Sequence, residues 1–179
     1  LYEVLSRLEL AGEVRRGYFI EGMSGAQFAL PEVVELLQQQ HLPANLNAPM
    51  VLLHSQDPSN LYGSGAPLDI PLLAGGTRPF LRRPGNWLVL RLGRPVLLIE
   101  QKGKRLTALA SASSDDVLAA VRTLPQLLGT TPGVGIGGNR LIVEQWNEET
   151  VTSSPGRELL EAAGFVRDYQ GMALYPPRV

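Results

Sequence analysis

Apolar side chains recur at helical spacing at the very start of the chain. Leu1, Leu5 and Leu8 lie on one face of a predicted helix, and Gly12 follows as its end. A strand-like run of polar and apolar residues over 13–20 comes next. The chain therefore enters a strand directly from a helix. Because the first residues are already helical in pattern and no initiator methionine precedes them, we expect a fragment of a longer protein.

A glycine-rich turn separates this strand from a second short apolar run over 27–30. A second helix is predicted over 32–40, with Pro31 at its first position. A helix followed by a two-stranded hairpin is typical of the end of a winged helix. We assign 1–42 to such a module and its trailing helix, because the proline and asparagine composition of 41–49 predicts a linker.

The residues from Met50 onward predict a second domain, 50–179, that is mostly antiparallel. Val51–Leu53 reads as a buried strand, and a long loop rich in glycine and proline runs from Asp57 to about Pro84. Three strand-like runs joined by short glycine turns then form a meander, over 87–92, 95–101 and 104–109.

Two helices and further strands complete this domain. Ser113 with Asp116 three residues later predicts a capped helix start, and Ser154 followed by Pro155 predicts another. Between them, 139–146 reads as a strand, and a strand or hairpin closes the chain. The fold class we predict is α+β: the tail of a winged helix followed by a mostly antiparallel, β-barrel-like domain with two helices.

Composition narrows the possible chemistry. The chain has 16 basic and 17 acidic residues and a net charge of -1, so any contact with nucleic acid must come from a local patch. There are no cysteines, and the two histidines, His41 and His54, lie far apart, so no metal site is predicted. Charges interrupt every apolar run, which argues against a membrane span and for a cytoplasmic protein.

One glycine motif needs a separate judgement. Residues 133–138 satisfy the dinucleotide pattern G-x-G-x-x-G, but a strand follows them where a helix is required, so we interpret them as a flexible loop. The chain shows no phosphate-binding loop and no nucleophile elbow. We therefore expect no cofactor and no ATP hydrolysis in this fragment.

Arg15 and Arg16 lie at the start of the predicted hairpin, where a wing can reach a phosphate or a minor groove. The alternative is a solvated strand face. Three further basic residues occur at a hairpin tip, where they also serve to keep an edge strand soluble. They are Lys102, Lys104 and Arg105.

A second basic group surrounds an aromatic residue in the long loop. Cations and a stacking ring are the combination that binds single strands. The alternative is an irregular loop that the aromatic ring holds in place. The group consists of Arg78, Phe80, Arg82 and Arg83.

Two carboxylates are candidate catalytic residues. Asp57 precedes Pro58, and Asp168 lies in a turn-prone segment, so each can also simply cap a turn. Either carboxylate would suit excision of a base, which requires stabilisation of an oxocarbenium-like transition state and orientation of water.

The residues 5–22 and 25–37 closely resemble the winged-helix tail of long Lhr-type helicases. Residues 55–63, with Asp57-Pro58, resemble the segment that follows it, and 93–100 resembles the barrel meander of that family. The resemblance implies a superfamily 2 DNA translocase whose ATP- and Mg-dependent motor lies upstream in the same polypeptide. It also implies a C-terminal region of winged helices and a β-barrel, similar to AlkZ-type DNA glycosylases and associated with oligomer assembly and, in some relatives, uracil excision.

Three hypotheses for the function follow. The first is an accessory module without a motor that binds single-stranded or tailed DNA or joins protomers into a homo-oligomer. The second is a glycosylase acting on uracil or an altered base, with Asp168 or Asp57 assisting. In the third, the barrel is purely an oligomerisation platform.

Overall fold

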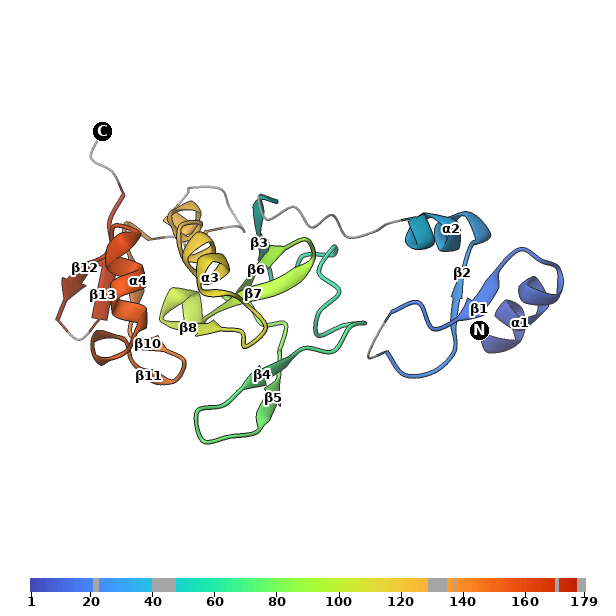
Figure 1. Ribbon diagram of the computed structural model, residues 1–179, viewed down its shortest axis with the longest axis horizontal. Helices are drawn as coiled ribbons and strands as arrows, with labels where there is room; N and C mark the ends of the chain where they lie inside the picture. Colours follow the sequence, from blue (N-terminus) through green and yellow to red (C-terminus); the bar gives the residue numbers. More distant parts are fainter. Residues whose placement is uncertain (21–22, 40–47, 129–134, 137, 170, 177–179) are drawn as a thin grey trace. The chain divides into compact units, whose positions relative to one another are not determined.

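The computed structural model describes residues 1–20, 23–39, 48–128, 135–136, 138–169 and 171–176 (Figure 1). Two compact units emerge: residues 1–47 with 65–67, and residues 48–64 with 68–179. Residues 41–47 of the predicted linker, with His41, and three of the six residues of the 133–138 glycine run lie outside the described residues.

The first unit has the predicted order of helix, hairpin and helix. Its antiparallel hairpin pairs Arg16 with Phe28. The side-chain amide of Gln27 orders the connection between the strands: its Oε1 accepts from the N–H groups of Phe19 and Ile20 at 2.7 and 2.8 Å. The elements are α1 (Tyr2–Leu10), β1 (Arg15–Gly17), β2 (Gln27–Ala29) and α2 (Pro31–Gln39) (Figure 1).

The second unit is built on a six-stranded sheet with the order β11-β10-β8-β7-β6-β3. The predicted meander forms its centre, and every pairing is antiparallel except that of β8 with β10. The strands are β3 (Met50–His54), β6 (Trp87–Arg91), β7 (Arg94–Glu100), β8 (Arg105–Ala108), β10 (Gln145–Trp146) and β11 (Glu149–Thr150).

Both faces of this sheet are covered at its centre. Trp87 and Val89 belong to the larger apolar cluster, whereas Leu88 and Leu90, which alternate with them on β6, belong to a smaller one. Because successive strand residues point to opposite faces, burial on both sides requires an uninterrupted apolar run, as the sequence of β6 has.

Helices and smaller sheets cover these faces. The helix α3 (Ser114–Val121) packs on β6 and β7 and contacts α4 (Gly156–Ala162). A three-stranded sheet, β12-β13-β9, ends the unit, and the long loop contains a two-stranded sheet, β4-β5. The remaining elements are β4 (Asp69–Pro71), β5 (Thr77–Pro79), η1 (Gln101–Gly103), η2 (Leu124–Leu128), β9 (Leu141–Val143), η3 (Val151–Ser153), β12 (Val166–Asp168) and β13 (Gly171–Leu174).

The α+β class is confirmed, but a barrel is not. Over the described residues, the six-stranded sheet has two different edges, β11 and β3, and β9 pairs with β13 in a separate sheet. The predicted continuous strand over 139–146 is divided at Glu144, whose N–H bonds the carbonyl of Lys104. Over the described residues, the six-stranded sheet is therefore open, whereas the sequence pattern predicted a barrel-like domain.

One predicted cap is confirmed and the other is wrong. Ser113 Oγ accepts from the N–H of Asp116 at 3.1 Å and begins α3. Ser154 Oγ instead donates to the carbonyl of Val151 at 3.0 Å, and α4 begins after Pro155 without a side-chain cap. Within the described ranges, no helix is long and apolar enough to cross a bilayer.

Candidate nucleic-acid interface

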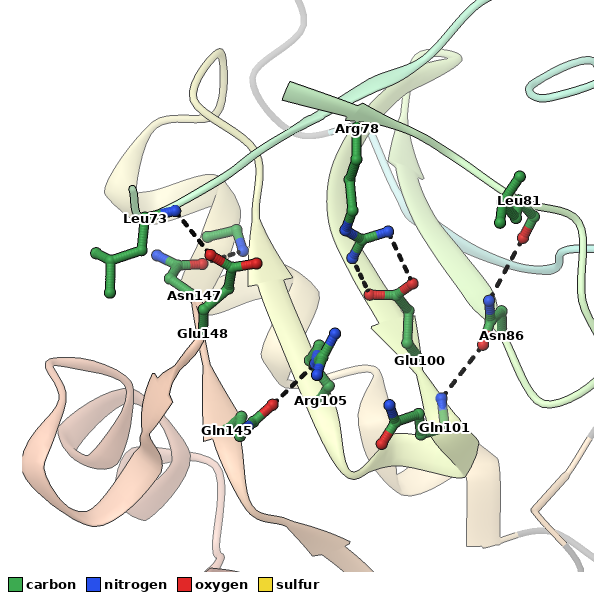
Figure 2. Close-up of polar contacts among 11 residues, drawn as sticks. Leu73, Arg78, Leu81, Asn86, Glu100, Gln101, Arg105, Gln145, Asn147 and Glu148 are labelled. Carbon is green, nitrogen blue, oxygen red and sulfur yellow. Dashed lines mark hydrogen bonds and ion pairs between the residues drawn. The ribbon is translucent and has the colours of Figure 1, made fainter. Parts of the chain in front are cut away.

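A row of polar side chains crosses four strands of the six-stranded sheet. Cross-strand pairs in register put Glu100 beside Arg105, Arg105 beside Gln145, and Gln145 beside Thr150. Directly paired residues point to the same face of a sheet, so these side chains form one line. Figure 2 shows Arg105 Nε donating to Gln145 Oε1, at 2.8 Å.

Arg78 is tied to the end of this row by an ion pair. Its guanidinium bonds both carboxylate oxygens of Glu100, with Nη1 and Oε1 3.2 Å apart (Figure 2). Both side chains are largely covered, at 27% and 12% exposed. A cation already neutralised by a buried carboxylate has little charge left for a phosphate, so Arg78 orders β5 against β7.

Two of the predicted basic clusters lie on neighbouring loops. The N–H of Lys102 donates to the carbonyl of Gly85 at 2.8 Å, and the N–H of Gln101 donates to Asn86 Oδ1 at 3.2 Å (Figure 2 shows the second bond). These bonds join the 83–86 loop to the η1 turn. We call the basic residues of this loop, this turn and the adjoining strand the basic ridge: Arg83, Lys102, Lys104 and Arg105.

The members of the basic ridge differ in how much of their charge is available. Arg83 and Lys102 are exposed, and neither side chain has a hydrogen-bond or ion-pair partner in the described part of the chain. Lys104 pairs with Glu144 at 2.8 Å, in contact with solvent. Among the residues that the structure describes, Arg105 bonds only the neutral amide of Gln145. Arg83 and Lys102 are therefore the cations most available to an anion.

Arg82 and Phe80 have structural roles in the long loop. The guanidinium of Arg82 donates from Nε to the carbonyl of Ser55 at 2.8 Å and from Nη2 to that of Asp57 at 3.0 Å. The ring of Phe80 is only 3% exposed and packs in the smaller apolar cluster. A buried ring presents no face to a base, so the loop is held in place by Phe80, the alternative reading of this cluster.

Arg15 and Arg16 belong to the first unit, and both pair with carboxylates. Arg16 bonds Glu9, with Nε 2.9 Å from Oε2, and its guanidinium also lies over the ring of Phe28. Arg15 approaches Glu35 at 4.0 Å with both side chains more than half exposed. Surface pairs of this kind are weak, so Arg15 can exchange its carboxylate for a phosphate more readily than Arg16 can.

A cleft of about 760 Å³ opens beside the polar row, and the candidate Asp168 lines it. Asp168 Oδ2 accepts from Arg140 Nη1 and from Tyr175 Oη, both at 3.3 Å. Its Oδ1 has no partner among the described residues. The lining consists of Arg140, Ile142, Glu144, Gln145, Thr150, Thr152, Arg167, Asp168, Tyr169 and Gly171.

Asp57 does not line this cleft. Its Oδ1 accepts from the N–H and the hydroxyl of Ser59, at 2.8 and 2.6 Å. The Ser59 hydroxyl is the main cause that lowers the pKa of Asp57, and the Ser59 N–H adds to it. This is the turn-capping arrangement that sequence reasoning allowed as an alternative.

Several lining residues were absent from the sequence-based candidates. Arg140, Arg167 and Tyr169 were not singled out because no local motif surrounds them. Of these three, only Tyr169 could have been identified from the sequence, as an aromatic residue at a hairpin position between Asp168 and the glycine that begins β13.

His54 packs edge to face against the ring of Trp87. The described residues include no group of three or more potential metal ligands.

Comparison with known proteins supports the family resemblance. Residues 1–47 match the family model of the winged-helix domain of the large helicase-related protein. A protein of Mycolicibacterium smegmatis named "Lhr helicase/ probable uracil glycosylase" is 37% identical over 131 residues, or 72% of this chain. The chain corresponds to a C-terminal region of an Lhr-type helicase. The Escherichia coli protein named "Lhr helicase/uracil glycosylase" is 29% identical over 169 residues, or 92% of the chain.

This Lhr region is short compared with its relatives. The chain spans 8% of the length of the M. smegmatis protein and 10% of that of the E. coli protein. The match to the winged-helix family model ends where the second unit begins. The basic ridge and the cleft therefore both lie outside the matched winged-helix domain, in the second unit.

Proposed function

We propose that this Lhr region is an accessory module that binds single-stranded or tailed DNA through the basic ridge. The observation that carries the proposal is the position of Arg83 and Lys102, which are exposed on loops joined by the bond from Lys102 N–H to the Gly85 carbonyl. Two cations free of carboxylates on adjoining loops can contact phosphates along one strand. An ATP- and Mg-dependent motor in the same polypeptide belongs to this proposal.

The test is the salt dependence of binding to a labelled single strand. Each phosphate contact adds about 0.7 to the slope of log K against log salt for single strands. The double variant Arg83→Ala/Lys102→Ala is expected to reduce the slope by about 1.4, twice this value, and to weaken binding. The matched control is Arg94→Ala/Arg122→Ala, which removes the same charge from exposed arginines outside the ridge.

The comparison between the two double variants decides the outcome. A loss in the ridge variant alone supports the assignment. Equal losses in both variants would show that net charge, and not the ridge, governs binding, and the proposal would be wrong. Assembly into a homo-oligomer stays a prediction, which light scattering of the protein without DNA decides.

A second candidate function is excision of uracil from DNA, favoured by the place of Asp168 in the cleft. The free Oδ1 faces no protein partner among the described residues, while Arg140 and Tyr175 fix the other oxygen. A carboxylate held in this way can stabilise an oxocarbenium-like sugar or orient a water. Both relatives carry uracil glycosylase in their names.

Incubation with a strand that contains one uracil, followed by alkali cleavage, tests this second function. A break at the uracil that disappears in Asp168→Asn and persists in Asp57→Asn would support Asp168 as the catalytic residue. A break that persists in both variants would exclude both carboxylates, and an intact strand with the wild-type protein would exclude the activity in this region.

A further inference from the structure

Side-chain bonds connect the basic ridge directly to the wall of the cleft. Lys104 Nζ pairs with Glu144 Oε1 and Arg105 Nε bonds Gln145 Oε1, each at 2.8 Å. Glu144 and Gln145 both line the cleft. Because the bonded atoms are in contact, the ridge and the cleft border one another. A strand whose phosphates follow the ridge therefore passes the mouth of the cleft.

The residues that line this cleft include an exposed aromatic residue, Tyr169. Tyr169 follows β12 and is 87% exposed. Its backbone has a φ of +51°, in the left-handed region that bulky residues seldom adopt. Water contact with the ring and strain in the backbone are both unfavourable, and local strain of this kind is concentrated at functional sites. The position presents a flat ring at the edge of a polar cleft.

The charges of the cleft leave one cation available. Arg140 pairs with Asp168, and Glu144 pairs with Lys104. Arg167 is exposed and has no hydrogen-bond or ion-pair partner within the described ranges. The cleft thus combines a free guanidinium, a stacking ring and a carboxylate oxygen, Oδ1 of Asp168, that can accept from an N–H group.

We infer that the cleft holds one unpaired nucleotide of a single strand, with Tyr169 stacked on its base and Arg167 in contact with its phosphate. Asp168 Oδ1 accepts a hydrogen bond from the edge of the base. The cleft volume of about 760 Å³ is within the usual range for small-ligand sites. The path of the strand rests on the proposed function, because the ridge brings the strand to the cleft.

Fluorescence anisotropy with a labelled oligothymidylate of about 16 nucleotides, the upper site size of a single-strand-binding fold, tests the inference. Loss of a base-stacking ring is expected to weaken binding about tenfold in Tyr169→Ala. Because Tyr169→Ala removes no charge, the slope of log K against log salt is expected to equal that of the wild type. Tyr169→Phe keeps the ring and is expected to bind within about twofold of the wild type. Arg167→Ala lowers the slope by about 0.7.

The outcomes separate this inference from the proposed function. If Tyr169→Ala binds like the wild type while Arg83→Ala/Lys102→Ala is weakened, the nucleotide site is wrong and the ridge stands. If all variants bind like the wild type, the proposed function fails as well. A thermal melt of each variant monitors folding, and a loss of binding in Tyr169→Ala with an unchanged melt and an unchanged salt slope supports the site.

Discussion

Arg105 and Gln145 are 40 positions apart in the sequence, yet Arg105 Nε lies 2.8 Å from Gln145 Oε1. They are register partners in the parallel pair β8–β10, so the bond reinforces the pairing at its first rung. It also orients Gln145, which lines the cleft. This side-chain contact thus links Arg105, the member of the basic ridge on β8, to a residue of β10 that lines the cleft.

This contact is expected to be worth about 0.5–1.5 kcal/mol of stability. A double-mutant cycle with Arg105→Met, Gln145→Leu and the combined variant, measured by urea unfolding, gives the coupling directly. The exposed pair Lys104–Glu144 is the matched comparison, with side chains 54% and 47% exposed, and its coupling is expected to be smaller. A coupling of zero between Arg105 and Gln145 would contradict the prediction.

Truncation of two neighbouring arginines in the long loop is expected to affect the free energy of unfolding differently. Arg82→Ala removes two hydrogen bonds to the carbonyls of Ser55 and Asp57 and should lower the free energy of unfolding by about 1.5–3 kcal/mol. Arg83→Ala should stay within about 0.5 kcal/mol of the wild type, as exposed substitutions do. Urea unfolding measures the stability and anisotropy measures the binding. An Arg83→Ala variant as unstable as Arg82→Ala would show that both side chains are structural.

Local patterns predicted most of the elements, because their causes are local. The helical spacing of apolar residues predicted α1 and α2. Ser113, with Asp116 three residues later, predicted the start of α3. The short glycine turns between apolar runs indicated the meander β6–β7–β8, which the register confirms. Turn chemistry also gave the correct alternative for Asp57, whose partner Ser59 is two residues away.

The candidate site was less predictable, since long-range pairing creates it. The parallel contact of β8 with β10 has no signature within either strand, so the cleft and the loop-to-turn contact at Gly85 could not be foreseen. Closeness in the sequence also gave a wrong grouping of the arginines in the long loop. Arg78 and Arg82 bond acceptors within the protein, and of the three only Arg83 belongs to the basic ridge. The predicted barrel is not confirmed for a similar reason: among the described residues, β9 pairs with β13 in a separate sheet, a long-range pairing that has no local signature.

The titration of Asp57 is expected to depend on one hydroxyl. The hydrogen bond from Ser59 Oγ is the main cause that lowers the pKa of this carboxyl, so Ser59→Ala should raise it toward the ordinary value of 3.8. A lowered folded pKa gives a contribution to stability that is present above the unfolded pKa and is lost as pH falls through the folded pKa. Carboxyl NMR titration measures the shift. Ser113→Ala, whose hydroxyl bonds the N–H of Asp116, is the control and should leave the pKa of Asp57 unchanged.

The first residue of α4 must be glycine because Trp146 lies against it. A Cβ at Gly156 would overlap the indole ring of Trp146, which is itself only 3% exposed. Gly156→Ala is therefore expected to lower the free energy of unfolding by about 1–3 kcal/mol despite the better helix propensity of alanine. Gly138→Ala is the matched control, because the nearest heavy atom to its Cβ would be the Arg140 carbonyl oxygen at an ordinary 3.6 Å. Urea midpoints of both variants decide the matter: equal midpoints would mean that the indole shifts without cost, whereas a loss confined to Gly156→Ala shows that the packing of α4 against β10 is fixed.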